Sequence, residues 1–127
     1  MQPRPTAAEL LATVAELLDN HVVAALDGPL QHQARVAASL VAIVERELRL
    51  APAADGHERA ALAGLLDGND GDPGEDLVAL RRRFADALRR GLADDDVTNA
   101  RVWEVLMDGV RADLAIVKPG HDDWSGT

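Results

Sequence analysis

The sequence contains no cysteine and no tyrosine, and its only aromatic residues are one phenylalanine and two tryptophans. Without cysteine the chain has no disulfide framework, no thiolate nucleophile and no zinc site built on thiolates. With so few aromatic rings, nucleic-acid bases find almost no side chains on which to stack. The composition therefore excludes disulfide-stabilised folds, enzymes with a cysteine nucleophile and zinc proteins with cysteine ligands, and it disfavours proteins that bind nucleic acid by stacking bases.

Positive charge is also scarce, because 13 lysines and arginines face 22 aspartates and glutamates and leave a net charge of -9. An acidic chain repels phosphate groups, so neither nucleic acid nor an anionic membrane is an expected partner. No apolar run approaches the roughly 20 residues that a membrane-spanning helix needs, and the N-terminus lacks the apolar core of a signal peptide. We therefore expect a cytoplasmic protein, and we predict neither a metal ion nor a cofactor.

The apolar residues that are present recur at helical spacing, and no segment alternates apolar and polar residues as a strand would. The 127 residues suffice for one domain with its own core. The sequence thus predicts an all-α fold, a bundle of four to five helices forming a single domain over residues 1–127. The tails 1–5 and 120–127 are expected to be flexible.

Capping residues and helix breakers set the expected helix ends. Thr6 and Glu9 form a capping box that starts the first helix, and Asp27-Gly28-Pro29 ends it. The second helix should end before Pro52. An acidic loop over 67–74 separates the third helix from the fourth. The second to fifth helices are expected at 30–50, 55–66, 75–90 and 97–118.

The first two helices carry broad apolar faces that are predicted to face the core. His21 shares a lane with apolar residues of the first helix, so we expect it to be partly buried. The fifth helix should pack through a stripe of its own, at Val102, Val105, Leu106, Val110, Leu114 and Val117. The faces of the first two helices comprise Leu10, Leu11, Val14, Leu17, Leu18 and Val22, and Val36, Ala37, Leu40, Val41, Ile43, Val44 and Leu48.

Glu47 falls inside the apolar face of the second helix, where a buried carboxylate without a partner would be costly. Beside that face runs a polar lane, defined here as His32, Arg35, Ser39 and Arg46. Three interpretations stay open. The residues form an ion-pair network that fixes helix packing, they bind a small molecule or anion, or they dock a partner. In the second case Arg35 and Arg46 clamp the anion, His32 acts as acid or base, and Glu47 orients one of them.

The fourth helix concentrates basic residues in an otherwise acidic chain. This surface is a possible docking face for an acidic partner, or a site for a phosphate-bearing ligand such as a nucleotide or coenzyme A. A third interpretation is a solvated face with local pairs, such as Arg82 with Asp86. The residues concerned are Arg81, Arg82, Arg83, Arg89 and Arg90.

The acidic segments do not match a known cation site. From Asp67 or from Asp70, the loop fails the calcium-binding spacing at both its glycine and its final glutamate. Asp94, Asp95 and Asp96 are better explained as the cap of the fifth helix. No phosphate-binding loop, nucleophile elbow or paired-histidine motif occurs, so no catalytic residue is assigned.

Three segments resemble a family of small bacterial proteins that is classed only as a domain of unknown function. They are RPTAAELL at 4–11, HQARVAASLVAIVEREL at 32–48 and DLAIVKP at 113–119. Members are typically encoded beside aminoglycoside-phosphotransferase-like kinases and acyl-CoA dehydrogenases. His32, Arg35, Arg46 and Glu47 match polar positions of the family, whereas Asn is common at position 39 and Lys is common near position 113. The resemblance implies a link to acyl-CoA metabolism.

These observations lead to two functional hypotheses. The first is a non-catalytic accessory protein that binds a kinase-like or acyl-CoA-processing enzyme, or that forms a homodimer in doing so. The alternative is a small-molecule module, for an anion or a CoA-type ligand, or a weak enzyme, whose site is the polar lane of the second helix.

Overall fold

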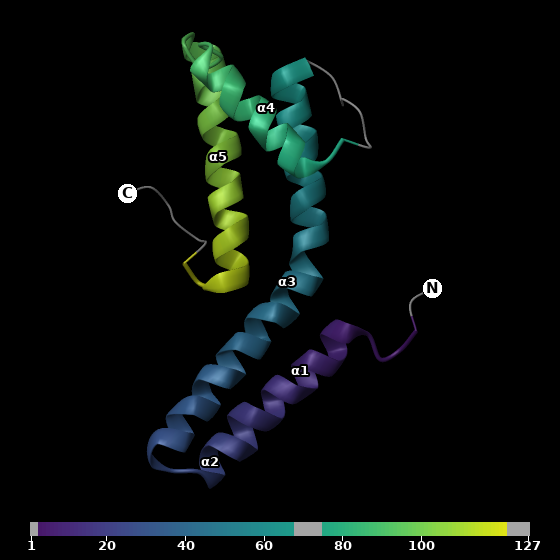
Figure 1. Cartoon of the computed structure of the whole chain (residues 1–127), viewed down its shortest axis with the longest axis vertical. Helices are drawn as coiled ribbons and strands as arrows, with labels where there is room; N and C mark the ends of the chain where they lie inside the picture. The colour runs from purple at the N-terminus through teal and green to yellow at the C-terminus, as the bar shows by residue number, and fades with distance from the viewer. Residues whose placement is uncertain (1–2, 68–74, 122–127) are drawn as a thin grey trace. The chain divides into compact units, whose positions relative to one another are not determined.

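The computed structural model describes residues 3–67 and 75–121 (Figure 1). Within these residues every regular element is helical, so the predicted all-α class is confirmed. Residues 68–74 of the predicted acidic loop lie outside the described part. The elements are α1 (Ala7–Leu17), a π-helical turn η1 (Leu18–Val22), α2 (Val23–Ala25), α3 (Gly28–Asp67), α4 (Leu77–Arg89) and α5 (Asp96–Val117).

The chain divides into two compact units, Met1–Ala51 and Pro52–Thr127, and α3 contributes residues to both. The first unit is a helical hairpin, and the second unit holds α4, α5 and the C-terminal part of α3. The single-domain organisation expected from the sequence stays a prediction.

Local hydrogen bonds shape the hairpin. The hydroxyl of Thr6 accepts a bond from the backbone N–H of Glu9 at 3.2 Å, which confirms the predicted cap of α1. The side-chain amide of Gln31 donates to the carbonyls of Val23 at 2.9 Å and Leu26 at 2.8 Å. These bonds satisfy carbonyls at the end of α2 and fasten them to the first turn of α3.

The inside of the hairpin is lined by small side chains. Its buried residues are Val23, Ala34 and Ala38, so α3 meets its neighbour along an alanine line. The predicted burial of the leucine and valine faces is only partly correct, because about half of these side chains are exposed. Half-buried are Leu11, Leu18, Val22, Ala37, Val41 and Ile43, whereas Leu10, Val14, Leu17, Val36, Leu40, Val44 and Leu48 are exposed. His21, which was expected to be partly buried, is exposed. The π-helical turn alters the register there and brings Val23 inward.

The prediction that a helix ends before Pro52 is also wrong. α3 continues through Pro52 to Asp67, and the two helices expected on either side of it are one. Proline removes one backbone donor and crowds the carbonyl four residues earlier, but alanine and leucine on both sides favour the helix. Pro52 is exposed, so its ring does not interfere with core packing.

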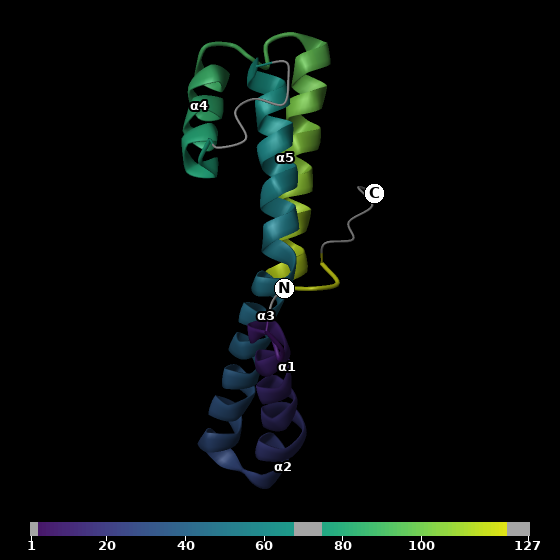
Figure 2. The same cartoon turned by 90° about the vertical axis from the view of Figure 1, so that its right-hand side faces the viewer.

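The second unit has a leucine-rich core drawn from three helices. Half-buried side chains such as Leu66, Leu88 and Leu92 surround it, and Figures 1 and 2 both show α4 beside the C-terminal part of α3 and beside α5. The fully packed residues are Leu62, Leu77, Leu80, Phe84 and Val102.

Gly91 ends α4 with a backbone conformation that other residues rarely adopt, at φ +98°. The N–H of Leu92 donates to the carbonyl of Ala87 at 3.0 Å, and the N–H of Gly91 donates to that of Leu88 at 3.2 Å. This pair of bonds is a Schellman motif. A β-carbon at position 91 would lie 2.5 Å from an oxygen of Asp94. The end of the fourth helix that the sequence predicted, near residue 90, is thus confirmed.

The substitution Pro52→Ala should stabilise α3. It restores a backbone N–H that can donate to the carbonyl of Leu48, and a proline inside a helix costs about 3 kcal/mol. We expect the free energy of unfolding, measured by urea titration followed by circular dichroism, to rise by on the order of 1–3 kcal/mol. Pro29→Ala is the matched control, because Pro29 lies in the first turn, where the N–H has no helical partner. A gain no larger than that of the control would contradict this account of Pro52.

Candidate interaction surfaces

The hairpin exposes a large apolar surface, called here the hairpin face. Its side chains are between 43% and 60% exposed, although leucine and valine normally belong inside a fold. Along α3, the exposed residues Val36, Leu40, Val44 and Leu48 recur every four residues and form one ridge. The residues of the hairpin face are Leu10, Val14 and Leu17 of α1, and Leu30, Val36, Leu40, Val44 and Leu48 of α3.

The contributions of α1 and α3 lie on the same side of the hairpin. The helices are antiparallel, since Ala8 and Glu9 of α1 line one hollow together with Glu45 and Leu48 of α3. Successive residues of a helix are about 100° apart around its axis. On both helices, most of the exposed apolar side chains are rotated in the same direction away from the buried side chains of that helix. Because the two helices are antiparallel and face each other, the same direction of rotation places these side chains on the same side of the pair. The hairpin face is therefore continuous across both helices.

The polar lane lies on the other side of α3. His32, Arg35 and Ser39 are exposed, and Arg46 is half-buried. The predicted neighbour Glu47 is separated from them, because it projects beside the ridge of the hairpin face, where it is exposed to water. Glu47 thus carries no burial cost in this chain, and the structure does not bring the five predicted residues together around it. Ligand binding by the lane stays a prediction.

An exposed lane makes a stability test possible. Arg35 is exposed, so Arg35→Ala should change the free energy of unfolding by less than about 0.5 kcal/mol. Ala38→Leu, one turn further along, should instead destabilise the hairpin by about 1–3 kcal/mol, because it overfills the buried alanine line. Chemical denaturation of both variants measures the contrast. A large loss in Arg35→Ala would show that the lane is a packing network after all.

The arginines of α4 are largely matched by carboxylates. Arg81 makes two hydrogen bonds of 2.8 Å to the carboxylate of Glu58 on α3, and this contact is the main cause that raises the pKa of its guanidinium. Arg83 binds Glu75 at 2.7 Å. Within α4, Asp86 pairs with Arg89 at 2.8 Å, whereas the pairing of Arg82 with Asp86 stays a prediction. The surface is consequently less basic than the sequence alone indicates, and its docking role stays a prediction.

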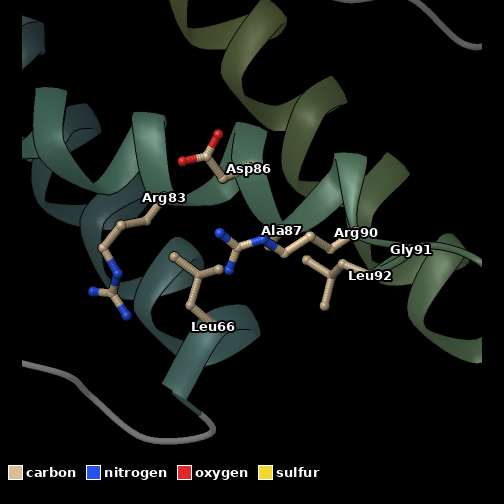
Figure 3. A pocket seen from close by; sticks show the side chains of 7 residues that line it. All are labelled: Leu66, Arg83, Asp86, Ala87, Arg90, Gly91 and Leu92. Atoms are coloured by element: carbon tan, nitrogen blue, oxygen red, sulfur yellow. The ribbon is translucent and has the colours of Figure 1, made fainter.

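A hollow of about 580 Å³ lies beside the end of α4. Figure 3 shows the side chain of Arg90 lying next to Leu66, while the carboxylate of Asp86 points away from both. Arg83 also lines this hollow, but its ion pair with Glu75 offsets its charge. The hollow therefore offers little net positive charge to a phosphate-bearing ligand.

A second exposed apolar surface runs along α5, and we call it the α5 stripe. It consists of Trp103, Leu106, Val110 and Val117, whose spacing of three, four and seven residues keeps them on one side of the helix. The predicted core stripe of this helix is only partly correct, because Val102 is buried but Leu106, Val110 and Val117 are exposed. Trp103, which is 59% exposed, received no role from the sequence. Its heptad spacing from Val110 and Val117 was the available signal.

The aspartates before α5 act as a helix cap, as predicted. The carboxylate of Asp95 accepts a hydrogen bond of 2.9 Å from the backbone N–H of Thr98. This bond is the main reason that the pKa of Asp95 lies below its ordinary value of 3.8. Among residues 3–67 and 75–121, no group of three or more histidines or carboxylates is arranged to hold a metal ion.

The cap predicts a specific pH dependence. Because the pKa of Asp95 is lower in the folded chain than its ordinary value of 3.8, its charge stabilises the fold above that pH. The contribution is lost as the pH falls through the folded-state pKa. We expect wild type to melt above Asp95→Asn at neutral pH, with a gap that closes in acid. Asp76→Asn is the control, because Asp76 caps α4 without a side-chain hydrogen bond. A gap that is independent of pH would contradict the assignment.

The chain belongs to the DUF6285 family, a domain of unknown function, whose model matches residues 24–121. The match includes the polar lane, the ridge of α3 and the α5 stripe, but not α1. No curated protein and no solved structure matches the chain. In the part of the chain that the structure describes, no helix has the length and apolarity needed to cross a membrane.

Proposed function

We propose that this protein is a non-catalytic accessory protein that binds a partner enzyme through the α5 stripe. The observation that carries the proposal is the exposure of Trp103 at one end of an apolar row on α5. Tryptophan is among the residues that contribute most to protein–protein affinity. A row of this spacing on one helix face suits docking into an apolar groove of a partner.

The net charge of the unit that carries the α5 stripe favours a partner with a basic surface. Residues 52–127 contain nine basic residues against sixteen carboxylates, which gives this unit a formal charge of -7. Opposite charges around an apolar centre steer association and select the partner. The arginines of α4 present little positive charge to a partner, because Arg81, Arg83 and Arg89 form ion pairs with carboxylates of the same chain.

The resemblance noted above supplies the class of partner. A kinase-like protein or an acyl-CoA-processing enzyme encoded nearby in a bacterial genome, and working in the cytoplasm, is the partner that we propose. The alternative site, the polar lane, has weaker support, because His32, Arg35 and Ser39 lie open to water and line neither of the two hollows described.

The proposal is tested by binding between purified components. The full chain would be mixed with the kinase-like protein and with the acyl-CoA dehydrogenase, and the dissociation constant measured by calorimetry. We expect Trp103→Ala to weaken binding by at least about tenfold, as truncation of a central tryptophan does. Glu104→Ala is the control, since this exposed neighbour lies off the stripe.

Three results would contradict the proposal. They are an absence of binding to both enzymes, equal binding by wild type and Trp103→Ala, and turnover of an acyl-CoA or phosphoryl substrate by the isolated chain. Circular dichroism of Trp103→Ala shows whether binding is lost because the variant unfolds. Because Trp103 is exposed, its substitution should leave the fold intact.

A further inference from the structure

We infer that the hairpin face binds the hairpin face of a second copy of this chain, so that the two hairpins form a four-helix bundle. This interface is separate from the α5 stripe and does not depend on the function proposed above.

The hairpin leaves many of its large apolar side chains exposed. Its buried side chains are one valine and two alanines, whereas eight leucines and valines are about half exposed. A contiguous apolar surface of this kind on a folded protein marks an interaction site. Helices in proteins are held mainly by packing of their apolar side, and in the hairpin only part of that side is packed.

The shape of the surface fits a second hairpin. The hairpin face is two antiparallel helices wide, and a second copy offers a surface of the same width. A twofold axis through the face places every contact twice and closes the assembly, so no further copies are added. Each helix then gains the two neighbours that helices have in a four-helix bundle.

The area also fits. A leucine or valine side chain removes roughly 60–120 Å² from water on full burial, so eight half-exposed side chains present on the order of 400 Å² per copy. A dimer interface of standard size buries about 800 Å² per partner, of which somewhat more than half is apolar. The apolar part that such an interface needs is thus close to what the hairpin face offers.

Charge favours self-association at this unit. Residues 1–51 contain four arginines against six carboxylates, a formal charge of -2 out of -9 for the chain. Two copies therefore repel each other least through their hairpins. The polar lane lies on the other side of α3 and stays in water. Glu47 projects at the outer edge of the face, where the rim of an interface remains solvated.

The first test is the mass of the full chain in solution, measured by size-exclusion chromatography with light scattering. Wild type should have twice the 13.5 kDa chain mass. Leu40→Glu, in the middle of the hairpin face, should have the mass of one chain. Arg35→Glu is the matched control on the other side of the same helix, and it should remain dimeric although it changes the charge by more.

A second measurement keeps the inference testable if Leu40→Glu does not fold. The chain has no cysteine, so Leu40→Cys introduces a single thiol. Mild oxidation should link Leu40→Cys into a disulfide-bonded dimer with wild-type helicity, at least tenfold faster than it links Arg35→Cys. A monomeric wild type, a dimeric Leu40→Glu or equal oxidation rates would each overturn the inference. Trp103→Ala should stay dimeric, so failure of this interface is distinguishable from failure of the proposed function.

Discussion

The close approach of α3 to the preceding helices along Ala34 and Ala38 is the contact on which the hairpin depends. Two alanines let the backbones come near, but they remove little apolar surface from water. Once these small residues occupy the inner line, helical periodicity sends Val36, Leu40, Val44 and Leu48 of α3 outward. The exposed ridge is therefore a direct consequence of which residues fill the hairpin.

The second unit follows a different design. Leu62, Leu80 and Phe84 provide large side chains that three helices share, and the Schellman motif at Gly91 turns the chain from α4 toward α5. Ion pairs such as Arg81 with Glu58 add specific contacts between helices at the surface. With its core already filled, this unit has apolar residues to spare along α5, and Trp103 is the most conspicuous of them. One chain thus combines a hairpin that leaves an apolar face exposed and a second unit that buries a core of its own.

Much of the local structure could be predicted from the sequence, because caps and glycine stops act over a few residues. Thr6, Asp95 and Gly91 behave as their sequence neighbours indicate. The predicted helix end at Pro52 is wrong, because a proline stop competes with strong helix formers on both sides and does not prevail at this exposed position. The direction of each apolar face could not be predicted either. A broad apolar helix has several sides that can face inward, and the apolar pattern by itself does not select the side of Ala34 and Ala38 over that of Leu40 and Val44.

The candidate site illustrates the same difficulty. Burial of the apolar face would require a partner for Glu47, but in the structure that face is open and Glu47 is exposed to water. Burial of the hairpin face against another chain is tested most directly by the thermal midpoint of wild type as a function of protein concentration. Folding coupled to dimer formation predicts a midpoint that rises with concentration, and a midpoint independent of concentration would contradict the claim.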